Sequence, residues 1–172
     1  MTLPIPHLGP LGLGLAAAIV SDLRRRRIPN AICGFVFFCG LTIRVIDQGW
    51  LQALMGVGAA ALVVAALYRP WLAQTIGGGD VKLAAASALW IPFSRLHWFA
   101  LGAALVGGLV ALINYFLARR PVQDEIRANL TLMVLRGDLP VVPSHRSRQD
   151  HRGVPYAVAI AGGVFVAFFV GL

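Results

Sequence analysis

The chain alternates between long apolar runs and polar connections. Six apolar runs can be marked as helical spans, and they cover residues 8–22, 30–47, 51–68, 80–92, 96–118 and 154–171. The first four connections are short, whereas the fifth, residues 119–153, is long and polar. The pattern predicts an all-α polytopic membrane protein with six transmembrane helices, in which residues 1–172 form one membrane-embedded domain.

The composition supports this class. Of the 172 residues, 58% are hydrophobic and only 13% are charged, which is far from the average of soluble globular proteins. The start of the chain, "MTLPIPHLG", has no basic segment before the first apolar run, so we expect that run to be retained as a span. Cys33 and Cys39 have no CxxC or histidine companion. We therefore expect two small apolar side chains, with no metal site, no disulfide and no cofactor.

The basic residues set the orientation. The chain has 15 Lys and Arg against 7 Asp and Glu. When alternate connections are placed on one side, 13 of the 15 basic residues share that side, and only Arg44 and Arg95 lie near the other. The positive-inside rule makes the basic side cytoplasmic and puts both chain termini in the periplasm. Because the positive charges flank apolar runs, the lipid bilayer is the expected partner and nucleic acid is not.

Two features of the spans concern the membrane surface. Four tryptophans lie near predicted span ends, where an indole ring favours the interface, and we expect them to be anchors: Trp50, Trp71, Trp90 and Trp98. Apolar residues between 122 and 134 recur at helical spacing, which fits a surface helix and a solvated loop equally well.

Two of the seven acidic residues are not explained by a polar loop. Four belong to the polar connection at residues 119–153. Asp47 lies at the outer end of a span, where a solvated turn explains it. Asp22 in "SDLRRRRIPN" and Asp80 in "IGGGDVKL" lie at the predicted cytoplasmic ends of spans. The carbonyl groups at a helix C-terminus disfavour a carboxylate, which makes the place of Asp22 unusual. Ionisable groups at membrane depth are costly and indicate function.

The fourth run is too short to cross the bilayer. From Asp80 to Pro92 it covers about 20 Å as a helix, whereas the hydrocarbon core is roughly 30 Å thick. We therefore expect Asp80 to lie below the membrane surface, with residues 71–79 folded inward behind it. Gly77, Gly78 and Gly79 suit such a loop because glycine permits positive φ and close backbone approach.

Two carboxyl groups in one low-dielectric pocket suit peptide hydrolysis. One acid stays protonated and polarises the carbonyl, while the ionised acid takes a proton from water. Simpler interpretations remain for each residue, since Asp80 fits an N-cap and Asp22 a partner for the arginines that follow. A small proton- or cation-coupled transporter would also use acids in a helix bundle, but here both acids share one end and no midplane charge continues a path. A catalytically silent scaffold is a third possibility.

Three motifs resemble the type IV prepilin peptidases, which are GxGD intramembrane aspartyl proteases. "GGGD" at 77–80 matches the GxGD motif, "SDLRRRRIPN" at 21–30 matches the first-aspartate region, and "VPYAVAIAGG" at 154–163 resembles the segment that opens the last helix. The resemblance implies that Asp22 and Asp80 are the catalytic aspartates. It also implies that the substrate is a prepilin whose cytoplasmic leader is removed at the bacterial inner membrane.

The chain departs from the larger members of that family. Arg24 to Arg27 leave no room for the cytoplasmic domain that they carry between the first two helices, and the paired CxxC zinc sites are missing from the sequence. The compact form resembles the Flp-type (TadV/CpaA) peptidases of tight-adherence pili, so no methyltransferase activity is expected. Gly77, Gly78 and Gly79 are expected to shape the site. Lys82 is a candidate contact for an acidic residue of the pilin or a group that influences the titration of the two acids, and snorkelling to lipid phosphate is its alternative role.

Overall fold

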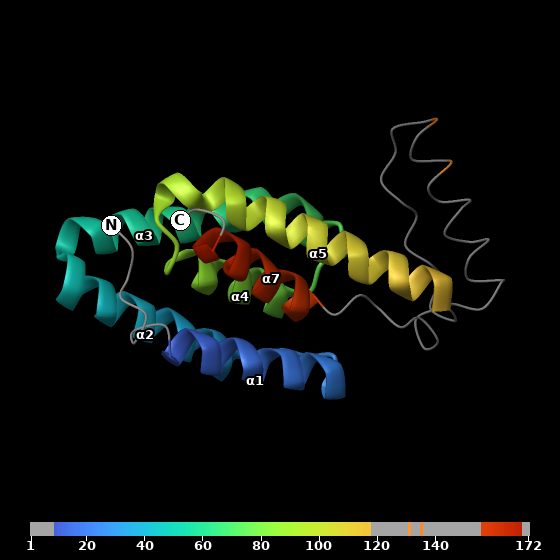
Figure 1. Cartoon of the computed structure of the whole chain (residues 1–172), viewed down its shortest axis with the longest axis horizontal. Coiled ribbons are helices and arrows are strands. Elements are labelled where there is room, and N and C mark those ends of the chain that lie inside the picture. The colour runs from blue at the N-terminus through green and yellow to red at the C-terminus, as the bar shows by residue number, and fades with distance from the viewer. Residues whose placement is uncertain (1–8, 118–130, 132–134, 136–155, 170–172) are drawn as a thin grey trace. The chain divides into compact units, whose positions relative to one another are not determined.

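The computed structural model describes residues 9–117, 131, 135 and 156–169 (Figure 1). Within these residues the regular structure is helical, and the helices are α1 (Gly9–Arg25), α2 (Asn30–Gln48), α3 (Trp50–Leu72), α4 (Gly78–Ala88), α5 (Leu96–Leu117) and α7 (Tyr156–Phe169), with a 3₁₀ turn at Phe93–Arg95. Each predicted apolar run contains one of these helices, which confirms the all-α class. The proposed surface helix at 122–134 falls outside the described residues, apart from isolated positions.

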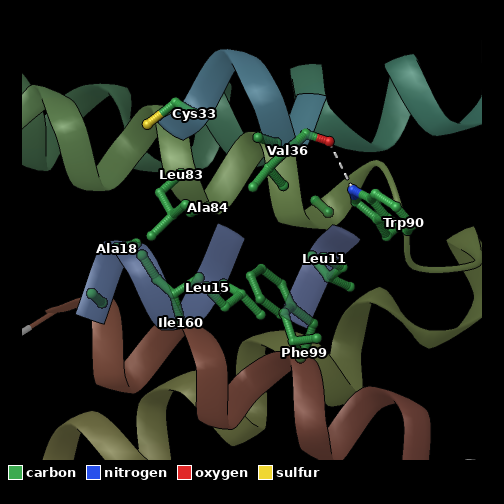
Figure 2. Close-up of a cluster of buried hydrophobic side chains, with 14 of the residues drawn as sticks. Leu11, Leu15, Ala18, Cys33, Val36, Leu83, Ala84, Trp90, Phe99 and Ile160 are labelled. Carbon is green, nitrogen blue, oxygen red and sulfur yellow. Dashed lines mark hydrogen bonds between the residues drawn. The ribbon is translucent and has the colours of Figure 1, made fainter. Parts of the chain in front are cut away.

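The chain divides into two compact units, one of residues 1–107 with 155–172 and the other of residues 108–154. The first unit is built around α4, which packs against α2, α3 and α7, while α1 packs against α2 and α7. Most of α4 is buried, including every residue from Leu83 to Ala88. Alanine dominates this helix, so neighbouring helices approach its backbone closely. Figure 2 shows the core that results, in which Leu15, Leu83 and Ile160 come from three different helices.

Two polar side chains lie near the C-terminal end of α4. The fully buried Trp90 donates its indole N–H to the carbonyl oxygen of Val36 on α2, at 3.0 Å (Figure 2). Arg44 is only 2% exposed and donates from Nη1 to the carbonyl oxygen of Gln52, at 2.8 Å. A cation near the last carbonyls of a helix is favourable, and Arg44 and the Leu89 carbonyl oxygen both lie beside Gly56. The Trp90 bond fixes the segment after α4 to α2 at the end opposite Asp80, whereas the Arg44 bond joins α2 to α3.

Trp90 is therefore a correction to the expected belt of interfacial anchors. Its ring lies against Gly40, where no side chain stands in the way, and its N–H has a buried partner. A buried indole needs such a partner, and the Val36 carbonyl supplies it. Trp50 and Trp71 remain exposed, as an interfacial role requires.

Several helix ends differ from the predicted runs. α3 continues past residue 68 to Leu72, so Arg69 is helical and not part of a loop. Pro70 is accommodated in the last turn, where its carbonyl accepts hydrogen bonds from the amide and the hydroxyl of Thr75. α4 begins at Gly78, two residues before the predicted start, and ends at Ala88, four residues before the predicted end. A hydropathy pattern misses such ends, because polar residues can lie in a terminal turn and apolar residues can follow the end of a helix.

Among the described residues, three segments are long and apolar enough to cross a membrane: Asn30–Gln48, Trp50–Leu72 and Phe93–Leu117. α7 is apolar but has 14 residues, and α4 has 11. α5 and α7 approach closely within the first unit, because Gly102 and Gly163 leave room between the two backbones. The chain is therefore a helical membrane protein, while six complete spans, the depth of Asp80 and the periplasmic termini stay predictions.

Candidate active site

Asp22 lies in the last turn of α1. Its backbone carbonyl accepts the amide of Arg26, and Arg26 has a positive φ of 51°, so the helix ends in a left-handed residue. The hydroxyl of Ser21 donates to the Arg27 carbonyl at 2.8 Å and holds the chain as it leaves the helix. Arg24 and Arg25 end the helix and Arg26 and Arg27 follow it; all four are exposed, while the Asp22 side chain is half-buried.

Asp80 lies in the first turn of α4. Gly77 is the N-cap residue, with φ −70° and ψ 143°, and the Asp80 amide donates to its carbonyl. In return, the Gly77 amide hydrogen-bonds the Asp80 carboxyl group. This is half of a capping box, in which the third helical residue satisfies the N-cap amide. The N-cap interpretation was therefore wrong about the position, although Asp80 does take part in capping.

Other atoms of the protein lie close to the backbone at each of the three glycines. None of them has a positive φ, because Gly77 is extended and Gly78 and Gly79 are helical. Of the two properties that made glycine suitable here, the structure uses close backbone approach and not positive φ. A Cβ on Gly77 would lie 2.8 Å from Oδ2 of Asp80, and one on Gly79 would lie 3.2 Å from the carbonyl oxygen of Ile28. Gly78 is less constrained, since its Cβ would lie 3.3 Å from Nε1 of Trp71. Glycine is needed most at 77 and 79.

The two motifs that carry the acids touch each other. The ammonium of Lys82 donates to Oδ1 of Asn30 at 3.0 Å, and the thiol of Cys33 donates to the Gly79 carbonyl at 3.7 Å. Together with the contact of Gly79 on Ile28, these bonds join "IPN" at 28–30 to "GGGDVKL" at 77–83. Lys82 therefore has a role that the sequence did not suggest, because it ties the start of α2 to α4.

The start of α7 completes the arrangement. The amide of Ala157 donates to Oδ2 of Asp22 at 3.2 Å, and the hydroxyl of Tyr156 donates to the Thr75 carbonyl at 3.4 Å. Thr75 lies in the loop that precedes α4. Two adjacent residues of α7 therefore contact both acid-bearing segments. Neither contact has a sequence signal of its own, apart from the resemblance of residues 154–163 to a motif that opens a last helix.

Asp22 and Asp80 are brought together by these elements. Their carboxyl groups are close enough to interact electrostatically, and Asp80 interacts in the same way with Tyr156. Both side chains are half-buried, so a water molecule can reach carboxyl groups that protein also surrounds. Cys33 and Cys39 are free thiols, and Cys33 is buried next to this region. The pair has the chemical properties needed for acid–base catalysis on a peptide bond.

Comparison with known proteins identifies one family. The model of the "Type IV leader peptidase family" matches residues 11–112, which is more than half of the chain and includes both aspartates. No curated protein and no solved structure matches the chain. Members of this family are proteases that process prepilins, and the matched region ends before α7 begins.

Proposed function

From its membership of the type IV leader peptidase family, we propose that this chain is a membrane aspartic endopeptidase that removes the leader peptide of Flp-type prepilins. Asp22 and Asp80 are its catalytic residues. The proposal is supported most directly by the electrostatic interaction between these two carboxyl groups, which belong to separate helices. α1 and α2 are joined by only four residues, Arg26–Pro29, which leave no room for the cytoplasmic domain that larger members carry at this place, so no methyltransferase activity is part of the proposal.

The reaction uses one proton shared by the pair. The ionised carboxylate takes a proton from water, and the oxygen of that water attacks the scissile carbonyl carbon. The neutral carboxyl gives its proton to the carbonyl oxygen, which forms a neutral tetrahedral diol. A hydroxyl of the diol then returns a proton to the acid that is now ionised, and the acid that is now neutral gives its proton to the leaving amine. The C–N bond breaks, and the pair regains its starting state.

The substrate reaches the site through the membrane. A prepilin carries its own hydrophobic helix, which partitions beside the spans and brings the leader junction to the acids. Gross charge attraction does not explain recognition, because Arg24 to Arg27 are exposed beside Asp22 and pilin leaders are themselves basic. In this proposal the site faces the cytoplasm at the bacterial inner membrane, since the basic residues cluster on that side.

Cleavage of a co-expressed Flp-type prepilin tests the proposal. The wild-type chain should convert the precursor to a faster-migrating product, whose new N-terminus is read by sequencing. Asp22→Asn and Asp80→Asn should each leave the precursor uncut while the protein still inserts. Asp47→Asn is the matched control, because Asp47 lies near the opposite end of α2 from the site and should be dispensable for cleavage. Normal processing by either Asp22→Asn or Asp80→Asn would show that the pair is not catalytic.

A further inference from the structure

The place of Asp22 in α1 calls for a compensating positive group. The last carbonyls of α1 make the local field negative, which disfavours a carboxylate. The first turn of α7 lies against this carboxylate, and the Ala157 amide donates to its Oδ2 at 3.2 Å. Ala157 is the second residue of α7, so its amide has no acceptor inside the helix and is free to serve a side chain. The positive end of α7 thus offsets the negative end of α1.

We propose that Ala157 is a positioning residue whose backbone N–H holds the Asp22 carboxylate in the orientation and charge state that the pair requires. This inference rests on the proposed function. It adds a third helix, α7, to the two helices that carry the aspartates. The group that acts is a backbone amide, so side-chain identity at position 157 is secondary.

The start of α7 is held firmly enough for this role. Ala157 is fully buried, and it belongs to the same core as Ala18 of α1 and Ala84 of α4. The hydroxyl of Tyr156 contacts the loop before Asp80 through the Thr75 carbonyl. α7 therefore packs on both helices that carry the acids, and its first amides keep a set position relative to Asp22.

The charged and titratable groups near the two acids come from every element that packs around them. Asp80 and Lys82 lie on α4, Cys33 on α2 and Tyr156 on α7, while Arg24 to Arg27 follow Asp22 on its own segment. Asp80 is the acidic neighbour, and its carboxyl group interacts electrostatically with that of Asp22. The Ala157 N–H favours the state in which one of the two acids is ionised, because it donates a hydrogen bond to a carboxylate. Without this donor, a higher pH is needed to reach that state.

Ala157→Pro tests the inference, since proline lacks the N–H and is tolerated in the first turn of a helix. Val158→Pro is the matched control, because it removes the next amide of the same turn, which is not the donor to Asp22. For Ala157→Pro we expect kcat/KM for prepilin cleavage at neutral pH to fall about tenfold, and the acid limb of its pH profile to rise by about one pH unit. Val158→Pro should leave the acid limb where it is in the wild type.

If the acid limb of Ala157→Pro lies at the same pH as that of the wild type, the inference is overturned, whatever the value of kcat/KM for the variant. If that variant does not accumulate, a backbone ester at position 157, made by replacing Ala157 with lactic acid, exchanges the same N–H for oxygen without changing the side chain. The ester must show the same shift of the limb. Different results contradict the proposed function. It is contradicted if the wild type does not cut the prepilin or if Asp22→Asn cuts it normally.

Discussion

At the scale of single residues, the site depends on the absence of side chains. The Asp80 carboxyl occupies the space that a Cβ on Gly77 would take, at 2.8 Å, and the Gly77 amide bonds the same carboxyl. Gly79 allows the backbone of α4 to lie against Ile28, which comes from the other acid-bearing motif. The GGGD sequence is therefore explained by the packing of the acid itself and not by an unusual backbone conformation.

Gly77→Ala should reduce cleavage far more than it reduces stability. The group that must move is the end of the Asp80 side chain, which can rotate cheaply but then leaves its catalytic position. We expect kcat to fall by 10-fold or more, as misplacement of a catalytic group by about 1 Å costs about 100-fold. Gly78→Ala is the control, since its Cβ meets only the edge of Trp71 at 3.3 Å. Equal activity of the two variants in a prepilin cleavage assay would refute this role for Gly77.

At the scale of elements, α4 is a short buried helix with a polar attachment at each end. Its start carries Asp80 and is tied to α2 by the bond of Lys82 to Asn30. The segment that follows it is tied to the same helix by the bond of Trp90 to the Val36 carbonyl. Because α4 has only 11 residues, the attachment at one end affects the position of the other.

Trp90→Phe should destabilise the protein by about 1–2 kcal/mol, because the indole N–H bond is lost and the buried volume shrinks. Trp50→Phe is the matched control, since Trp50 is 76% exposed, and it should change stability by less than about 0.5 kcal/mol. Thermal unfolding of the purified proteins in one detergent measures the difference. Indistinguishable unfolding temperatures for the two variants would contradict the account of how α4 is fixed.

At the scale of the whole molecule, much of the architecture could be predicted because hydropathy reports directly on helices in a membrane. The six apolar runs each contain a helix, and Asp22 and Asp80 stood out as acids that no polar loop explained. The Ala157 amide could not be predicted, since a backbone donor has no signature in the sequence. Trp90 was misjudged because burial and interfacial anchoring both place tryptophan near a helix end, and only the packing at Gly40 separates them.

The predicted topology places the two ends of α3 on opposite sides of the membrane. Gln52 and Arg69 are exposed near those ends, about 25 Å apart along the helix axis. In a chain whose native cysteines are replaced, Gln52→Cys should react with a membrane-impermeant maleimide added to whole spheroplasts. Arg69→Cys should react only after the membrane is permeabilised. The opposite pattern would reverse the orientation and move the proposed site to the periplasmic side.

The central claim is that Asp22 and Asp80 act as one catalytic unit, and the kinetics of the double variant test it most directly. In a purified system, Asp22→Asn and Asp80→Asn should each lower kcat/KM for prepilin cleavage by about 10⁴-fold, as do members of other catalytic units. The variant that carries both changes should be no slower than either single variant, because the first loss already disables the pair. Losses that multiply would show two independent residues and contradict the account.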